Sequence, residues 1–591
     1  MQIKLIDKPS KDISPKVQCC LNRKVPIKDI PKYLSNTYED IYSPETFGED
    51  LLKSGIKMLV EHIKANHNIF VVVDSDVDGF TSAAILINYL HRQFPAFTEN
   101  YIDFGLHSGK GHGLTDFIDA LETSAYSLVI CPDSATNDIE QIERLHNVNT
   151  DVLILDHHLS EVPFSPYAVT INSQYHGNNK ELSGAGVVLK FCQYMDTLLG
   201  TNVANDFKDL AAVGLQSDMM SITELETKEM IFEGLRSENI KNPLINAICE
   251  KNEFAMTKAD YAVSPYNDLM VSPMAISFFC TPLLNAVCRS GTQEEKELTF
   301  KAMLTMYAFQ EIPSTKRGHK LGDMETILTQ MTRQITNIKN RQERAVTAGM
   351  ELLEAAAADM MEHKTFVFAL DDGDIEPNIR GLCANKLMAK YQRPVAVTSR
   401  LEDGTYAGSM RGYTATGINN FKAIAEKSKY CKQVIGHENA AGIFLDDPGA
   451  FVDDMDKELA NISTDIVYYV DYIFNEYTID PEVIIALAEL NDYLGQNFSR
   501  PQVFVENIKI TNDNFKVMKS NTGKIDVNGI SIMLFGMTDE QIEQFIPGTV
   551  INFVCKCNIN EWNWQRNPQL ISIDYEIINE EPVSITESWG F

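Results

Sequence analysis

The stretch that decides the fold is Ile69-Phe-Val-Val-Val-Asp74-Ser-Asp76-Val-Asp78-Gly79-Phe-Thr-Ser82. Its first five residues are apolar and mostly β-branched, which predicts a strand buried on both faces. Residues 81–90 then carry apolar side chains at helical spacing. Three alternating aspartates therefore fall at a strand-to-helix turn, and such turns in α/β sheets are common places for functional sites.

Three carboxylates this close repel one another and raise one another's pKa unless a cation neutralises them. A bound divalent metal ion is the simplest explanation of the cluster. Two alternatives stay open at this point. One is a solvated acidic turn without a ligand. The other is a calcium loop of the EF-hand type, but its twelfth position would be Ile85 where a Glu is required, and a strand rather than a helix precedes it.

Length and composition indicate a large globular protein. At 591 residues the chain exceeds what one hydrophobic core usually organises, so we expect three or four units. A hydrophobic fraction of 44% and a charged fraction of 23% are typical of globular proteins. No apolar run approaches about 18 residues, and the first residues lack the apolar segment of a signal peptide. We therefore expect a cytoplasmic protein that does not enter the membrane.

Cysteine usage and net charge argue against two classes of protein. The 11 cysteines include no Cys-x-x-Cys pair, which argues against a zinc site and favours reduced thiols. The formal net charge of −31 argues against a protein that coats nucleic acid by bulk electrostatics. A nucleic-acid enzyme remains compatible with this charge, because a metal site and a few Arg or Lys side chains can line one channel. Such an enzyme would depend strongly on a divalent cation.

Two further predicted strands end in acids as the first one does. An apolar run over residues 127–131 leads to Asp133, and one over residues 151–155 leads to Asp156-His157-His158. With a short strand at 101–104 and helical segments in between, these runs indicate βαβ units and a parallel sheet. Because the carboxyl ends of parallel strands share one edge, these side chains should converge with the first turn. This convergence favours a metal site over both alternatives.

The segment over residues 206–218 has helical spacing and contains two candidate acids. Asp218 ends the segment and is our predicted ligand, whereas Asp209 could equally be a surface or capping residue. Earlier in the chain, Leu182-Ser183-Gly184-Ala185-Gly186-Val187 is a turn of small residues that opens a helix. Such a turn suits close backbone packing or the approach of a phosphate.

The remaining pattern divides the chain into five parts. Residues 1–45 contain several prolines and predict an irregular or partly helical lead-in. Residues 46–322 hold the parallel sheet and a helical part. Residues 323–363 have helical spacing and predict one long connecting helix, or two end to end. Residues 364–468 predict a second, smaller α/β domain. Residues 469–591 contain about five short β-rich runs and suggest a small barrel, for which an oligonucleotide-binding barrel is one candidate.

Two glycine-rich motifs lie in the predicted second α/β domain. They are Gly408-Ser409-Met-Arg411-Gly412 and Gly436-His437-Glu-Asn-Ala-Ala-Gly442. Glycine and other small residues permit close backbone approach, and Ser, Arg and His side chains can bind phosphate oxygens. The alternative for either motif alone is a turn followed by the start of a packed helix.

Taken together, these residues resemble the DHH phosphoesterase superfamily, and within it the RecJ family of single-strand-specific exonucleases. Asp156-His157-His158 is the motif that names the superfamily, and the resemblance runs loosely from about residue 50 to 580. Ile435, Cys288 and Trp564 stand where the family usually has glycine or another small residue, which affects substrate handling more than the chemistry. The segments that carry the resemblance are 74–79, Asp133, 183–186, 210–218, 110–114, 282–289, 340–342, 436–442 and 560–570.

The resemblance implies two Mn²⁺ or Mg²⁺ ions at the edge of the sheet, which would activate water against a phosphodiester. It also implies catalytic roles for Asp133, His157 and His158. Asp156 would orient His157 without binding metal itself. The implied metal ligands are Asp74, Asp76, Asp78, Asp133, His157 and Asp218, with Asp133 as the bridge and Asp74 as either a ligand or an acid behind the ligands.

The resemblance further implies stepwise 5′ to 3′ hydrolysis of single-stranded DNA to 5′-mononucleotides, in repair, recombination or replication. Single-stranded DNA is then the expected partner, replication or repair proteins are candidate partners, and a monomer is expected. Two alternatives remain: a DHH-type phosphodiesterase for oligoribonucleotides or cyclic dinucleotides, and a non-catalytic DNA-binding replisome adaptor. The implied substrate-binding residues are His158, Arg289, Ser409, Arg411, His437 and Lys110.

Overall fold

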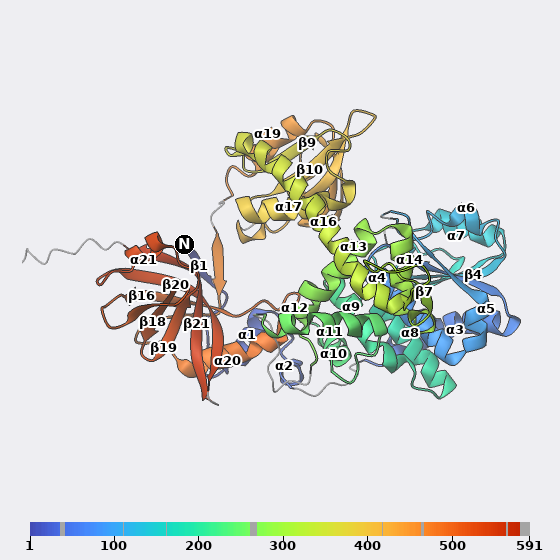
Figure 1. Ribbon diagram of the computed structural model, residues 1–591, viewed down its shortest axis with the longest axis horizontal. Coiled ribbons are helices and arrows are strands. Elements are labelled where there is room, and N and C mark those ends of the chain that lie inside the picture. Colours follow the sequence, from blue (N-terminus) through green and yellow to red (C-terminus); the bar gives the residue numbers. More distant parts are fainter. Residues whose placement is uncertain are drawn as a thin grey trace, which may run out of the picture.

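Three sheet-containing regions surround a layer of helices in the computed structural model of this chain (Figure 1). In Figure 1 the first α/β region lies on the right, the second α/β region above the centre, and the C-terminal sheet on the left. Among the described residues, no helix is long and apolar enough to cross a membrane. The residues that the structure describes are 1–35, 42–109, 111–160, 162–259, 269–416, 418–462, 466–562 and 565–578.

The sheet of the first α/β region has five parallel strands, as predicted from the alternation of strand and helix patterns. The sequence predicts four of them, but not the last strand along the chain, which lies at one edge. In spatial order the strands are β3 (Ile102–Leu106), β2 (Asn68–Val73), β4 (Tyr126–Pro132), β5 (Asp151–Asp156) and β6 (Ala168–Asn172).

Strand β2 is buried on both faces, as its uninterrupted apolar run predicts. Ile69, Val71 and Val73 belong to the large core beneath one face of the sheet, whereas Phe70 and Val72 belong to a separate core on the other face. The two cores are covered by different helices. Those on the first side are α3 (Glu49–Ala65), α4 (Val77–Gln93) and α8 (Gly184–Leu199), and those on the second are α6 (Ile118–Leu121) and α7 (Ile139–Asn147).

One long helix, α16 (Ile327–Ala357), joins the helical layer to the second α/β region. It starts later than the predicted helix, because residues 324–326 form a short strand and Thr326 caps the helix by accepting from the amide of Thr329. Its first half packs in the main core and its second half in the core of the second region. The helices of this layer are α9 (Lys208–Ser217), α10 (Leu225–Gly234), α11 (Pro243–Thr257), α13 (Thr281–Ser290) and α14 (Gln293–Met303).

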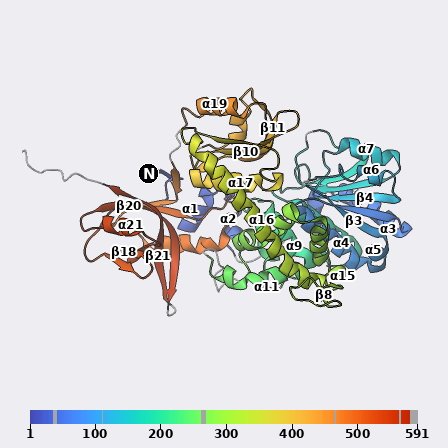
Figure 2. The same cartoon turned by 45° about the horizontal axis from the view of Figure 1, so that its top comes forward.

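The second α/β region contains a five-stranded mixed sheet. Both glycine-rich motifs lie on strands of this sheet, so the alternative of a turn before a helix is wrong for each. Helix α17 (Pro377–Tyr391) lies on the side that faces α16 (Figure 2). In spatial order the strands are β12 (Cys431–His437), β13 (Ala440–Leu445), β11 (Tyr406–Arg411), β10 (Val395–Arg400) and β9 (Phe366–Leu370).

The C-terminal sheet has seven strands, rather than the five or so short runs of the prediction. Two of its strands, β20 and β21, form one long antiparallel hairpin. In spatial order the strands are β15 (Tyr472–Phe474), β16 (Gln502–Lys509), β20 (Val550–Trp562), β21 (Gln565–Ile578), β19 (Ile530–Leu534), β18 (Thr522–Val527) and β17 (Phe515–Met518).

The N-terminal lead-in is tied to the C-terminal region. Strand β1 (Gln2–Leu5) pairs in parallel with β14 (Val467–Val470), a pairing that the prolines of the lead-in did not predict. Close by, Arg23 Nη1 lies 2.7 Å from Asp471 Oδ1, and both side chains are buried. Removing either partner would leave the other charge buried without compensation, so this pair holds the lead-in in place.

Candidate active site

The turn after β2 is shaped around its aspartates. Asp76 has extended backbone angles and caps α4, because its Oδ1 accepts a hydrogen bond from the amide of Gly79 at 3.0 Å. A Cβ atom on Gly79 would lie 2.5 Å from the Cβ of Asp74, so only glycine fits there. Asp78 follows in the first helical turn with 1% of its surface exposed. The sequence thus forces three acids together at the amino end of one helix.

A second helix start binds the carboxylate of Asp78. Its two oxygens accept hydrogen bonds from Ser183 Oγ at 2.8 Å, the amide of Gly184 at 2.7 Å and the amide of Ala185 at 3.2 Å. These donors lie at the amino end of α8, where unpaired amides and the helix dipole favour negative charge. The turn of small residues therefore binds a carboxylate of the protein itself. From the sequence, both close backbone packing and the approach of a phosphate were possible roles for this turn.

Asp133 follows β4 in a left-handed backbone conformation, with φ of 63°. Residues other than glycine rarely adopt this backbone conformation, and such strain is retained mainly at functional sites. Asp133 is 1% exposed, and its amide donates to the carbonyl of Leu155 at 2.8 Å. Gly184 lies against it so closely that a Cβ there would approach the Cβ of Asp133 to 2.4 Å. The carboxylate is therefore fixed from both sides.

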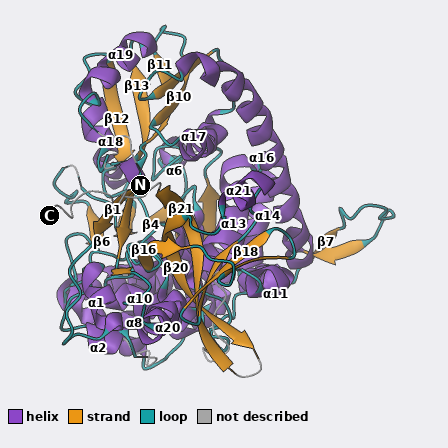
Figure 3. Cartoon of the chain, turned by 90° about the vertical axis from the view of Figure 1, so that its left-hand side faces the viewer, coloured by secondary structure: helices purple, strands orange, loops and turns teal. Residues whose placement is uncertain are grey.

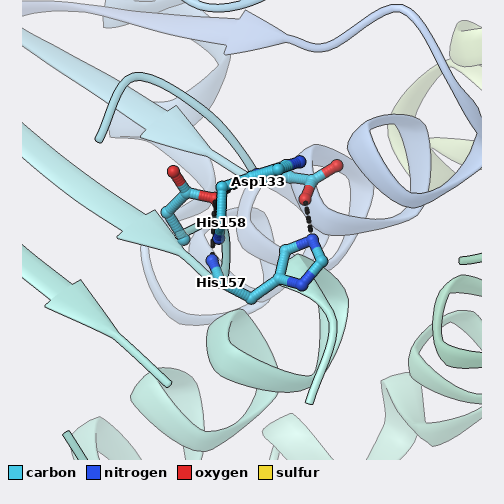
Figure 4. A group of neighbouring side chains, drawn as sticks. Asp133, His157 and His158 are labelled. Atoms are coloured by element: carbon cyan, nitrogen blue, oxygen red, sulfur yellow. Dashed lines mark hydrogen bonds and ion pairs between the residues drawn. The ribbon is translucent and has the colours of Figure 1, made fainter. Parts of the chain in front are cut away.

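The ring of His157 points towards the carboxylate of Asp133 (Figure 4). Its Nε2 lies 3.2 Å from Asp133 Oδ1, 3.5 Å from Asp218 Oδ2 and 3.9 Å from Asp78 Oδ2. The predicted convergence of these side chains is thus observed. Asp218 joins the group from the end of α9, whereas Asp209 is buried elsewhere and accepts from the amides of residues 241 and 242. We refer to Asp76, Asp78, Asp133, His157 and Asp218 as the acidic rim.

Burial and mutual repulsion shift the pKa values within the acidic rim. Burial, followed by the charge of Asp78, raises the pKa values of Asp133 and Asp218 well above their usual range. Burial and the neighbouring carboxylates Asp74 and Asp78 raise the pKa of Asp76 to about 6. Burial and the nearby ring of His158 lower the pKa of His157 to about 4. A neutral imidazole thus lies among crowded carboxylates, and a bound cation would relieve the repulsion between these carboxylates.

Asp156 holds the ring of His158, whereas the sequence predicted that it would orient His157. Its Oδ1 lies 2.8 Å from Nδ1 of His158 and accepts from the amide of His157 at 2.7 Å. Its other oxygen accepts from the amide and the hydroxyl of Thr136. Although burial opposes it, the hydrogen bond to Asp156 raises the pKa of His158 to about 9. His158 is thus anchored at one nitrogen and 42% exposed, so its cation faces outward.

Two histidines that the sequence analysis did not assign a role surround Asp74. His112 Nδ1 lies 3.0 Å from Asp74 Oδ2, and its ring meets that of His158 edge to face at 4.8 Å. His107 is fully buried, bound through Nδ1 to Asp116 at 2.7 Å, with Nε2 3.7 Å from Asp74 Oδ1. His107 directly follows β3, so the rule that located Asp133 at a strand end could have found it. His112 stands in the segment that resembles the family.

The acidic rim fits two divalent cations. Two buried atoms at its centre, Asp133 Oδ1 and His157 Nε2, have no hydrogen-bond partner among the described residues. Oxygen ligands with one imidazole suit Mn²⁺ and Mg²⁺, with Mn²⁺ better matched to the nitrogen. Three overlapping groups have ligand atoms close enough to share an ion: Asp74, Asp76 and Asp133; Asp78, His157 and Asp218; and Asp133 with Asp156, His157 and His158.

A cavity of about 380 Å³ opens on the sheet of the second α/β region, and Ser409 and Arg411 line it. Arg411 donates to the carbonyl of Met410 at 2.7 Å. Burial and the nearby guanidinium of Arg289 lower the pKa of Arg411. Neither arginine has an ion-pair partner among the described residues, so an anion would be favourable here. We call this cavity the basic pocket.

The structure brings some of the predicted substrate residues together and leaves others apart. Asn378 of α17 donates to the carbonyl of Arg289 at 2.8 Å, which links α13 to the wall of the basic pocket. His437 is exposed at the end of β12 and does not line the pocket. Lys110 lies outside the described residues. The basic pocket therefore contains Ser409 and Arg411, with Arg289 beside it.

Comparison with known proteins places the chain in a family. Residues 68–215 match the DHH family, N-terminal domain, and residues 470–574 match the RecJ OB domain. The SPbeta prophage-derived single-strand DNA-specific exonuclease YorK of Bacillus subtilis (strain 168) is 31% identical over 537 residues, covering 88% of this chain and 89% of that protein. The chain belongs to the RecJ-type branch of the DHH family.

Other RecJ proteins are more distant but share the architecture. The RecJ of Bacillus subtilis (strain 168) is 23% identical over 557 residues, covering 92% of this chain and 65% of that protein. The crystal structure of a RecJ from Thermus thermophilus superposes with a TM-score of 0.72 at 16% identity, covering 98% of this chain and 80% of that chain. The predicted fold is thereby confirmed: a parallel-sheet DHH domain, a long connecting helix, a smaller α/β domain and a C-terminal OB-like region.

Proposed function

We propose that this RecJ-like chain is a metal-dependent exonuclease that removes nucleotides stepwise, 5′ to 3′, from single-stranded DNA. The observation that carries the proposal is the acidic rim, where acids from three strand or helix ends lie within 4 Å of the Nε2 of His157. A non-catalytic adaptor would have no need to keep this costly arrangement of buried charge. The 5′ to 3′ polarity rests on the family resemblance.

In this proposal Asp76, Asp78, Asp133, His157 and Asp218 would hold two divalent cations, Mn²⁺ or Mg²⁺. When bound, such a pair lowers the pKa of water and stabilises the entering and leaving oxygens at phosphorus. The RecJ of Thermus thermophilus was crystallised with each of these ions, which supports the choice. The chain's own residues fix the site: α8 holds Asp78, and Gly184 holds Asp133.

The phosphates of the substrate nearest the rim are bound by two histidines. His158 presents a cation outward because Asp156 binds its Nδ1, and His112 is anchored to Asp74 in the same way. In both cases a carboxylate takes one ring nitrogen, which leaves the other nitrogen for a phosphate oxygen. Both rings are partly exposed, so an incoming strand can reach them.

Phosphates farther along the strand are bound by the second α/β region. Arg411 of this region and Arg289 of α13, beside the basic pocket, supply positive charge, with Ser409 as a neutral donor. None of these groups distinguishes bases, so binding is independent of sequence. Exposed rings such as Tyr477 and Phe535 in the C-terminal region add base stacking, which is also sequence-tolerant.

A digestion assay tests the proposal. Single strands labelled at the 5′ or the 3′ end, a duplex, an oligoribonucleotide and a cyclic dinucleotide are incubated with Mn²⁺ or with a chelator. We expect immediate release of label from 5′-labelled single strands, as mononucleotide, and no release in the chelator. Preference for the oligoribonucleotide or the cyclic dinucleotide would favour the phosphodiesterase alternative. Binding of DNA without any metal-dependent hydrolysis would favour the adaptor.

Single-stranded DNA is the partner that this proposal requires. Replication or repair proteins as further partners, a monomeric state and a cytoplasmic location remain predictions. Sedimentation of the purified chain with and without a short single strand would measure the oligomeric state and the binding stoichiometry together. A monomer is expected in both conditions, with one chain bound per oligonucleotide.

A further inference from the structure

A β-hairpin stands clear of the protein surface just before α16 (Figure 3). Its strands are β7 (Glu311–Pro313) and β8 (Met324–Thr326), which pair antiparallel. We call residues 311–326 the finger. Every residue from 315 to 324 is exposed, and a Cβ on Gly318 or Gly322 would meet nothing within 4 Å. The tip therefore contributes no burial to the fold, so its sequence is free to serve contacts outside the chain.

The tip of the finger, residues 315–322, is basic in a strongly acidic protein, and Asp323 is the first acid after it. Residues 315–322 read Thr-Lys-Arg-Gly-His-Lys-Leu-Gly and include no acid, whereas the chain as a whole has a formal net charge of −31. Lys316, Arg317 and Lys320 are exposed and have no ion-pair partner among the described residues. By contrast, Arg341 of α16 is paired with Glu295 at 2.7 Å. Three cations without ion pairs thus lie close together in the sequence at the tip.

The finger has a fixed base and does not depend on its tip for order. Glu325 accepts from Arg333 of α16 at 2.6 Å and from the amide of Thr315 at 3.0 Å. Gln334 donates to the hydroxyl of Thr315 at 2.9 Å. Asp323 accepts from the backbone amide of residue 320 at 2.8 Å. These two acids therefore bind groups other than the side-chain cations of the tip, which stay uncompensated.

The finger carries its cations away from the acidic body of the protein (Figure 3). An arm of seven residues extends at most about 25 Å, and even half of that exceeds the Debye length of about 8 Å at physiological ionic strength. Repulsion between the acidic body and a nucleic acid is screened over that distance. Cations on a projecting hairpin can therefore contact phosphates that the rest of the surface would repel.

We propose that the finger binds the backbone of duplex DNA that adjoins the single strand being digested. The finger is a projecting two-stranded ribbon, and a two-stranded β-ribbon fits the major groove of DNA. Three flexible cations bind phosphates without reading bases. The proposal rests on the proposed function for the identity of the strand, and it goes beyond hydrolysis because it concerns DNA that the acidic rim does not cut.

Binding of the full-length protein is measured with divalent cations chelated, so that hydrolysis plays no part. The probes are a fluorescent duplex, a duplex with a single-stranded 5′ overhang, and a single strand, over a series of salt concentrations. The variant is K316Q/R317Q/K320Q, and the matched control is K8Q/K11Q/K28Q, which removes three exposed cations that have no ion pair among the described residues. We expect the finger variant alone to lose about tenfold in affinity for both duplex probes. Its salt slope should fall by about 2 to 3.

Three results would overturn the proposal: unchanged binding of both duplex probes, an equal loss in the control variant, or a loss confined to the single strand. If the finger binds an acidic protein instead of DNA, binding of both duplex probes should be unchanged, which is the first of these results. Hydrolysis of a short single strand is measured separately with Mn²⁺ and should match the wild type in both variants. Failure of the finger proposal and failure of the exonuclease proposal are therefore read from different experiments.

Discussion

The acidic rim and the basic pocket hold their functional side chains in opposite ways. In the rim, a glycine at the start of α8 lies against the Cβ of Asp133, and a Cβ there would come within 2.4 Å. In the pocket, Gly381 lies against Arg411, but the atom that its Cβ would meet at 2.7 Å is Nη2, at the flexible end of the side chain. The acidic rim, which performs chemistry on phosphorus, is thus held rigidly close to the backbone. The basic pocket, which binds a moving strand, can adjust.

Replacing Asp133 should have the largest effect, because it lies at the centre of the rim. Asp133→Asn removes a charge that a pair of cations needs, and we expect hydrolysis with Mn²⁺ to fall by at least about 10³-fold. Thermal unfolding should show that the fold is kept. Asp151→Asn is the matched control, since Asp151 is the first residue of β5 and lies at the other end of this strand from the rim. Activity of Asp133→Asn close to that of the control would remove the rim from the mechanism.

Gly184→Ala should come next, although it changes no charge. The added methyl would displace Asp133 or the start of α8, and small misplacements at a reacting centre cost about 10²-fold. We expect lower kcat and weaker activation by Mn²⁺. Gly186→Ala, in the same helix, is the control, because its Cβ would meet the side chain of Leu182 at 3.1 Å, which can shift. Equal losses in the two variants would point to a general weakening of α8 instead.

Arg411→Gln should have a smaller effect that is confined to substrate binding. A lost charge-assisted hydrogen bond is worth about 1.5 to 3 kcal/mol, so KM for a single strand should rise by about tenfold or more. The value of kcat should change little, because the rim is intact. Arg400→Gln, at the end of the neighbouring strand β10, serves as the control. A fall in kcat with KM unchanged would place Arg411 in the chemical step. It would also contradict the distinction between a catalytic rim and a pocket that only binds substrate.

Gly381→Ala should have the smallest effect and gives the sharpest comparison. Its methyl would meet the end of the Arg411 side chain, which can turn aside, and would lie 3.5 Å from Ser409 Oγ, an ordinary van der Waals contact. We expect KM and kcat within about twofold of the wild type, in contrast to Gly184→Ala. Steady-state kinetics on one labelled single strand, run for both alanine variants side by side, measures the difference. If the two variants lose activity equally, the distinction between a rigid rim and an adjustable pocket is wrong.

The acidic rim could be predicted from the sequence because its signals are local. Asp74, Asp133 and Asp156 each follow or end a buried apolar strand, and rim residues follow Asp74 and Asp156 within two positions. The shared edge of a parallel sheet then brings these segments together. The same logic located the long helix and both regions that it connects. It misjudged where α16 starts, since Met324–Thr326 pairs with a strand whose apolar content is too low to predict one.

What the sequence did not reveal depends on partners that are distant along the chain. β1 pairs with β14 at the far end of the protein, and nothing within Gln2–Leu5 indicates that partner. Asp156 binds the ring of His158, and spacing along the chain does not show which of the two histidine rings it would bind. His112 reaches Asp74 from a loop, where no periodicity applies. These features are tertiary contacts. The main roles of the residues involved could be predicted from the sequence, but their additional partners could not.

Manganese anomalous diffraction from crystals of the protein grown with Mn²⁺ tests the central claim most directly. The account predicts two anomalous peaks within the acidic rim, both in contact with Asp133 and one of them with His157. Peaks confined to other parts of the molecule, with none at the rim although Mn²⁺ supports hydrolysis, would contradict it.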